Sequence, residues 1–271
     1  MPAQGSDCGW PWVPSASLIR KRSHIRPGAG SVQLQRSGTG RPGATGTLVE
    51  RRLGARRRYS PEVASSEGVR LGEQAARQLV QTGRHEIGPG LTDAEFTRIE
   101  RDYEFEFADD HRAFLAAGLP LKTPEPYERR NPWPDWRDGD PGDLREILGW
   151  PVEGTLFDVQ YDAFWHPSWG QRPARMSKAL STARRHLAQA PKMIPVWGHR
   201  YLPAGRGTYG HPVLSIYQTD VIMFGTDLAE YIAIEFQRRS MIPDLTPPPD
   251  WIPPPMVPFW SDFLTGELGW S

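Results

Sequence analysis

The sequence predicts an α+β fold in which a twisted, mainly antiparallel sheet is packed by helices. Three closely spaced runs have the length and the β-branched or aromatic composition of strands: residues 193–197, 213–217 and 221–224. A helix is expected directly after them. Thr226 is a suitable cap, and the apolar residues that recur at helical spacing after it are Leu228, Tyr231, Ile232 and Phe236. Together these runs predict a meander with one face covered by a helix.

Two amphipathic helices are expected where ordered sequence begins, at Leu91. Thr92 and Glu95 form a capping box for the first helix, and the apolar residues after them repeat along one face. Asp109 is a suitable cap for the second helix, and Gly118 is placed to end that helix in a left-handed turn. These helices would pack against the meander.

The middle of the chain is expected to be a loop, a short helix, a strand and a longer helix. Residues 119–140 carry five prolines and predict a loop, after which the pair Asp140 and Pro141 starts a helix that Gly149 stops. Residues 155–160 have the composition of a strand. A further amphipathic helix is expected from about residue 174 until shortly before Pro191.

The chain is expected to fall into three parts: a basic arm at 1–88, an α+β domain at 89–239 and a C-terminal strap at 240–271. The arm has 14 Lys and Arg against 6 Asp and Glu, a net charge of +8, and the remainder has 18 against 26, a net charge of −8. Its Gly, Arg, Ser and Pro content predicts disorder, apart from a short helix at 73–82. A nucleic-acid tail, an organellar transit peptide and untranslated upstream sequence remain alternatives for the arm.

The strap is rich in proline and aromatic residues and is expected to lie back over the domain. The side chains that would hold it there are large and apolar: Trp251, Phe259, Trp260, Phe263 and Leu264. We expect Ser261 to cap a last helical turn within it.

Composition also bounds the function. The only cysteine is Cys8, so a disulfide within the chain and a cysteine-based metal site are excluded. No apolar run approaches the ~20 residues of a membrane-spanning helix, and the N-terminus lacks the apolar core of a secretory signal. A cytoplasmic protein is therefore expected. The acidic folded part argues against nucleic acid as its partner and suits a basic protein.

The sequence contains no strong catalytic or cofactor motif. Residues 205–210, GRGTYG, match a dinucleotide fingerprint, but they run into a strand instead of opening a helix, so a hairpin loop is expected. Six residues suggest a metal site without any close ligand spacing: Asp158, Asp162, His166, His199, His211 and Asp220. The serines lack a nucleophile elbow. The sequence therefore predicts no enzyme, no cofactor and no metal.

A protein-binding surface is the stronger candidate. Between residues 133 and 140, WPDWRDGD, aromatic residues alternate with acidic ones, which suits contact with a cationic protein. The alternative is that both tryptophans lie in the core and the acids are only solvated. The expected partner-binding residues are Trp133, Asp135, Trp136, Asp138, Asp140, Asp143, Trp165, His166 and Trp169.

Between residues 91 and 236 the chain resembles the SUKH superfamily, which contains the fungal Smi/Knr cell-wall regulators and many bacterial immunity proteins. The segments that carry the resemblance are LTDAEFTRIE at 91–100, FLAAGLP at 114–120, WPDWR at 133–137, GTLFDV at 154–159, FWHPSWG at 164–170, IPVWGHRYLP at 194–203 and SIYQTD at 215–220. The proline- and tryptophan-rich insert at 122–140 departs from the family pattern.

The resemblance implies an α+β fold without a catalytic set and with a role in binding another protein. It implies, for bacterial members, neutralisation of a polymorphic toxin, often a nuclease. Our hypothesis is a cytoplasmic, non-enzymatic immunity-type protein that covers a basic toxin with its acidic, aromatic surface. A regulatory scaffold of the Smi/Knr type and a metal-dependent enzyme using His166 and His199 are the alternatives.

Overall fold

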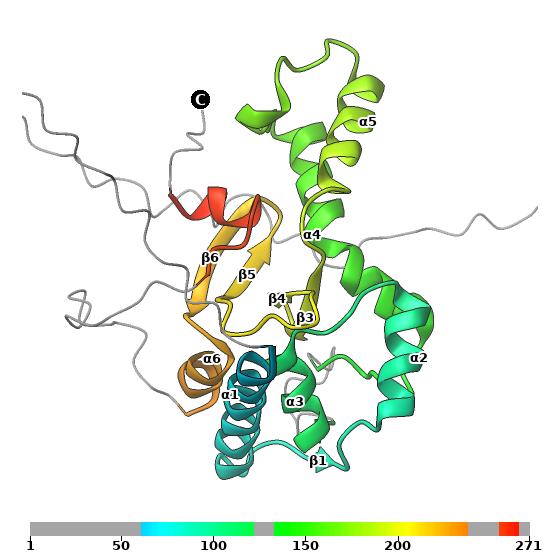
Figure 1. The fold of residues 1–271 in the computed structure, drawn as a ribbon. Helices are drawn as coiled ribbons and strands as arrows, with labels where there is room; N and C mark the ends of the chain where they lie inside the picture. Colours follow the sequence, from blue (N-terminus) through cyan, green and yellow to red (C-terminus); the bar gives the residue numbers. More distant parts are fainter. Residues whose placement is uncertain (1–60, 122–132, 238–254, 266–271) are drawn as a thin grey trace, which may run out of the picture. The chain divides into compact units, whose positions relative to one another are not determined.

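The computed structural model describes residues 61–121, 133–237 and 255–265 of the 271-residue chain (Figure 1). All of them fall within one compact unit, Arg56–Ser271. The helices are α1 (Pro61–Gln81), α2 (Asp93–Tyr103), α3 (Asp109–Ala117), α4 (Pro141–Tyr161), η2 (Pro167–Trp169), α5 (Met176–Leu187), α6 (Leu228–Phe236) and η3 (Trp260–Thr265). The strands are β1 (Ile87–Gly88), β2 (Leu119–Pro120), β3 (Met193–Trp197), β4 (Arg200–Pro203), β5 (Val213–Tyr217) and β6 (Asp220–Gly225).

The predicted α+β class is confirmed. The strands β3, β4, β5 and β6 form an antiparallel sheet in that order, and β1 pairs with β2 in a second, two-stranded sheet. The first and second predicted strands of the meander are β3 and β5, and the third lies within β6. The strand β4 was not predicted, because its four residues include an arginine and a proline. All four are buried, because Leu202 points into the main core on one face of the sheet and Tyr201 packs under the C-terminal segment on the other.

Helix α1 corrects the predicted boundary of the arm at residue 88. This helix packs against α3 and α6 (Figure 1). Ala75, Ala76 and Leu79 on its inner face are buried in the main core. The predicted short helix at 73–82 is the last part of it. A 21-residue helix supplies enough apolar surface to dock even though its surroundings in the sequence are polar and basic. Residues 1–60 lie outside the described part of the chain.

Helix α4 corrects two further predictions, because it continues through Gly149 and includes residues 155–160, which were predicted to be a strand. Pro151 lies inside this helix and cannot donate to the carbonyl of Ile147, four residues before it. The hydroxyl of Tyr201 on β4 donates to that carbonyl at 3.1 Å instead. A tertiary hydrogen bond thus satisfies the group that proline leaves free, and the helix continues.

The caps of the two early helices follow the sequence in part. The capping box of Thr92 and Glu95 is present at the start of α2. Helix α3 has Ala108 as its N-cap, and Asp109 is its first residue. Gly118 ends α3 in an extended conformation, with φ of 176°, so the predicted left-handed turn is wrong.

Helices cover the four-stranded sheet on one face, and the C-terminal segment covers the other. The main core joins that first face to α1, α2, α3 and α6. On the second face, Met193, Tyr201 and Leu214 pack with Val257 and Trp260 of the C-terminal segment. The predicted strap is therefore confirmed for residues 255–265, whereas Trp251 lies outside the described residues. A third apolar cluster lies between α4 and α5.

Candidate functional site

The two tryptophans expected to anchor a partner are buried. Trp133 is 3% exposed and Trp136 is 1% exposed. The ring of Trp136 lies 5.4 Å from that of Phe107, and Trp133 stacks on Phe236 at 5.4 Å. The predicted binding role of both tryptophans is therefore wrong for this conformation, because their apolar area is already used in the core. The core alternative is the one the structure supports.

The acidic residues around these tryptophans are exposed, and two of them accept hydrogen bonds from backbone N–H groups. The carboxylate of Asp135 accepts a hydrogen bond from the Asp138 N–H, and that of Asp140 accepts from Gly142 and Asp143 at the start of α4. The side chains of Asp138 and Asp143 face solvent. The predicted acidic surface thus exists, but its aromatic component lies below it.

The turn that carries Trp165, His166 and Trp169 is largely internal. His166 is 4% exposed and Trp169 is 6% exposed, so their predicted role as exposed partner-binding residues is wrong, whereas Trp165 is half-buried. His166 is the N-cap of η2: its Nδ1 accepts from the N–H of Ser168 and lies 2.7 Å from the hydroxyl of that serine. Its Nε2 faces the Asp262 carboxylate at 3.3 Å. The turn and the C-terminal segment are held together here.

Three of the residues considered for a metal site have partners in different parts of the fold: Asp158, His166 and His211. Asp158 is buried and accepts from the backbone N–H and the hydroxyl of Thr219, fixing α4 to the β5–β6 turn. Burial lowers the pKa of His199 to about 4, and His211 Nδ1 lies 3.1 Å from the carbonyl of Pro255. Among the residues that the structure describes, no group of three or more His, Cys, Asp and Glu could hold a metal ion.

The glycine-rich segment at 205–210 is a loop between β4 and β5, as expected, and the carboxylates of α3 bind its backbone. Asp109 accepts from the Gly207 N–H at 2.9 Å, and Asp110 accepts from the Gly210 N–H at 2.8 Å. These are the N–H groups that would face a phosphate in a nucleotide-binding loop. Because side chains of this chain already occupy them, the loop serves to join α3 to the sheet.

Asp110 makes the stability of this junction depend on pH. Burial raises the pKa of its carboxyl to about 6, against hydrogen bonds from Gly210 and His111 that lower it. A carboxyl with a raised folded-state pKa stabilises the fold most below its unfolded pKa, and that contribution is lost as the pH rises through the folded pKa. The difference between the two pKa values corresponds to about 3 kcal/mol.

We therefore expect the free energy of unfolding, relative to that of Asp110→Asn, to rise by about 2.5 kcal/mol as the pH falls from about 7 to about 4, since pH 4 is still close to the unfolded pKa. Urea unfolding of both proteins at the two pH values measures this. His111 is buried and neutral with its pKa lowered to about 3, so it loses stability on acidification, but it does so in both proteins. Parallel pH profiles of the two proteins would contradict the prediction.

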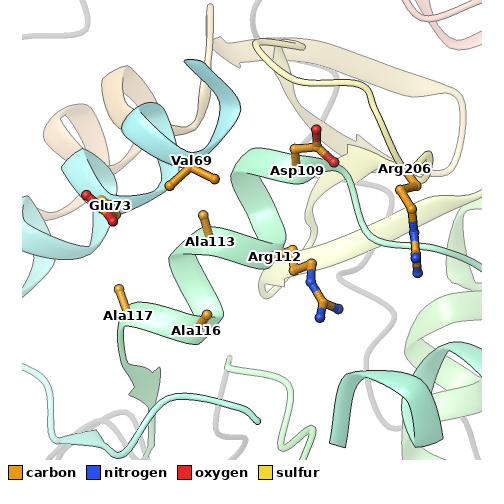
Figure 2. A pocket seen from close by; sticks show the side chains of 8 residues that line it. All are labelled: Val69, Glu73, Asp109, Arg112, Ala113, Ala116, Ala117 and Arg206. Carbon is orange, nitrogen blue, oxygen red and sulfur yellow. The ribbon is translucent and has the colours of Figure 1, made fainter. Parts of the chain in front are cut away.

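A groove of about 500 Å³ runs between α1 and α3 (Figure 2). Its lining consists of Val69, Glu73, Asp109, Arg112, Ala113, Ala116, Ala117 and Arg206. The two arginines already form ion pairs: Arg112 lies 2.6 Å from Asp93, and Arg206 lies 2.8 Å from Glu100. An anion would have to displace these carboxylates, so the groove is not a ready anion site.

The solvent-facing side of α4 carries the combination of residues that was expected at 133–140. Six residues spaced three or four apart lie along one side of this helix: Asp143, Glu146, Trp150, Glu153, Phe157 and Tyr161. We call them the acidic aromatic face. Phe157 is 39% exposed and Tyr161 is 64% exposed, with their rings 4.6 Å apart. The spacing of these six residues in the sequence is that of a helix. It was overlooked because residues 155–160 were predicted to form a strand.

Comparisons of this chain with protein-family models, with curated proteins and with solved structures returned no match. In the described part of the chain no helix is both long and apolar enough to cross a membrane.

Proposed function

We propose that this chain is a non-enzymatic, immunity-type protein that binds a basic, toxin-like protein and covers its surface. The observation that supports this best is the acidic aromatic face of α4. The resemblance to the SUKH superfamily supports the same class of function, and the single cysteine suits the cytoplasm as the place of action.

The aromatic residues of this face suit a binding anchor. Large exposed apolar side chains that contact each other are uncommon on a surface without a partner. Aromatic side chains are enriched where binding energy is concentrated, because they bury much area at a low cost in side-chain entropy. Phe157 and Tyr161 therefore form the proposed centre of the interface, with the partly exposed Trp150 beside them.

The charge of the face selects the partner. Asp143, Glu146 and Glu153 contribute three negative charges, and the exposed Asp135, Asp138 and Asp140 lie just before the helix. Residues 93–162 as a whole contain 18 acidic and 8 basic residues. A surface of this sign steers a basic protein towards it and disfavours an acidic one.

The experiment begins with the partner captured from the source cells by the full-length chain and identified by mass spectrometry. We expect a basic protein whose affinity falls by about 2 kcal/mol or more, roughly 30-fold, in the double variant Phe157→Ala, Tyr161→Ala. Isothermal titration calorimetry measures the affinity. Co-expression then tests whether the chain relieves the toxicity of that partner.

The matched control is Val80→Ala, which removes apolar atoms from an equally open position on α1, where Val80 is 57% exposed. It should leave the affinity unchanged. Both sets of variants should unfold within about 0.5 kcal/mol of the wild type, because they lie on the surface. An acidic partner, or a partner bound equally well by the double variant, would contradict the proposal.

A further inference from the structure

The charges of the folded part are divided between two consecutive stretches of the chain. Residues 163–219 contain 8 Lys and Arg and no Asp or Glu, whereas residues 93–162 are strongly acidic. The net negative charge of the folded part therefore hides a basic region. Helix α5 lies within that region, beside α4 (Figure 1).

Among the described residues, helix α5 also carries most of the cations that have no partner. In the described part of the chain, five Arg and Lys side chains have no recorded hydrogen bond, ion pair or ring contact: Arg84, Arg175, Lys178, Arg184 and Arg185. Four of the five belong to α5 or its N-cap, and all four are exposed. Three of these, Arg175, Lys178 and Arg185, are spaced three and seven residues apart on one side of the helix, over about 15 Å. We call this side the basic face.

Two of these cations lie at the N-terminus of α5, where a positive charge destabilises the helix. Arg175 is the N-cap and makes no capping hydrogen bond, and Lys178 is in the first turn, which contains no acidic residue. The N-terminus of a helix already carries partial positive charge, so cations there are unfavourable by a few tenths of a kcal/mol each. A local preference broken without a compensating contact inside the fold is typical of a functional surface.

We propose that the basic face of α5 binds the phosphate backbone of single-stranded nucleic acid. A row of unpaired cations matches a repeating anion, and the exposed Ser181 lies between them as a further hydrogen-bond donor. The basic face has no aromatic anchor of the kind that a protein interface needs. The half-exposed Trp165, 5.9 Å from the Arg172 guanidinium, offers a surface on which a base can stack.

The test uses the full-length chain and a fluorescent single strand of about 20 nucleotides at about 50 mM salt, with binding followed by anisotropy. The triple variant Arg175→Gln, Lys178→Gln, Arg185→Gln should weaken binding about tenfold or more. It should also reduce the slope of log affinity against log salt by about 2, because three phosphate contacts are lost. Residues 1–60 carry 11 basic and 2 acidic residues and can bind the strand on their own, so the position of contact needs a direct measurement.

Ultraviolet crosslinking of a 4-thiouridine strand to the wild-type chain, followed by peptide mapping, supplies it. We expect crosslinks in the peptides that span residues 163–192. The matched control is Arg70→Gln, Arg77→Gln, Arg101→Gln, which removes the same charge from cations that already have carboxylate partners. Crosslinks confined to residues 1–60, or an equal loss of binding in the control, would overturn the proposal. Variants of the acidic aromatic face should leave this binding unchanged, so the two proposals can fail separately.

Discussion

Gly72→Ala is expected to lower the free energy of unfolding by about 3 kcal/mol or more, although alanine favours a helix over glycine by about 1 kcal/mol. Gly72 lies where α1 crosses α3. A β-carbon at this position would lie 2.1 Å from the carbonyl oxygen of Asp110 and 2.7 Å from the β-carbon of Ala113. Both obstacles belong to the backbone or its first side-chain atom, so the two helices would have to move apart. Urea unfolding followed by circular dichroism measures the effect.

The control for this prediction is Gly149→Ala in the middle of α4. A β-carbon there would meet no atom within 4 Å, so only the helix preference of alanine remains. We expect this variant to be as stable as the wild type or more stable, by up to about 1 kcal/mol. Two glycines inside helices should thus give changes of opposite sign. Equal effects of the two substitutions would show that the close crossing of α1 and α3 does not govern the stability of the fold.

Trp136→Ala is expected to cost about 3–5 kcal/mol of folding free energy, the range typical of a fully buried tryptophan. The ring is enclosed by Tyr103, Phe105 and Phe107, with ring centres 5.4 to 6.4 Å away. Removing it leaves a cavity in the main core that these side chains cannot fill without leaving their own contacts. If Trp136 were an interface anchor, its replacement by alanine would instead lower the binding affinity and leave the free energy of unfolding almost unchanged. Urea unfolding separates the two roles.

Trp150→Ala serves as the comparison. Trp150 is partly exposed on α4, and its indole N–H lies 3.4 Å from the Glu146 carboxylate on the same helix. We expect this variant to lose no more than about 1 kcal/mol, because a surface side chain leaves no cavity when it is removed. A stability loss at Trp150 as large as that at Trp136 would place both tryptophans in one core and contradict the acidic aromatic face.

The strands and helix caps show where local sequence was sufficient. The residues 193–197 and 213–217 form strands as predicted, and the capping box of Thr92 and Glu95 is present at α2. In each case a few neighbouring residues carry both the pattern and its cause, because turn chemistry, side-chain alternation and capping act within one turn or strand. The helix at 228–236 also forms as predicted, but its N-cap is Asp227, which accepts from the Glu230 N–H, and the predicted cap Thr226 is wrong.

The candidate site was predicted less well because burial is decided by the whole fold. Residues 133–140 have the composition of a binding surface, yet the tryptophans lie in the core while the acids remain in solvent. The alternation of aromatic and acidic residues is the same for both outcomes, so no local pattern separates them. The exposed aromatic residues are Phe157 and Tyr161 instead, in a segment whose composition indicated a strand.

By itself, then, the sequence determined the α+β class, three of the four strands of the main sheet, the capping of α2 and the strap over the second face. The tertiary structure decided what depends on contacts between distant segments. Tyr201 donates the hydrogen bond to the Ile147 carbonyl that Pro151 cannot donate. Helix α1 packs against α3, and Trp136 is buried in the main core. Local preferences amount to less than about 1 kcal/mol per residue, whereas burial of one large side chain is worth several times that, so packing prevails where the two disagree.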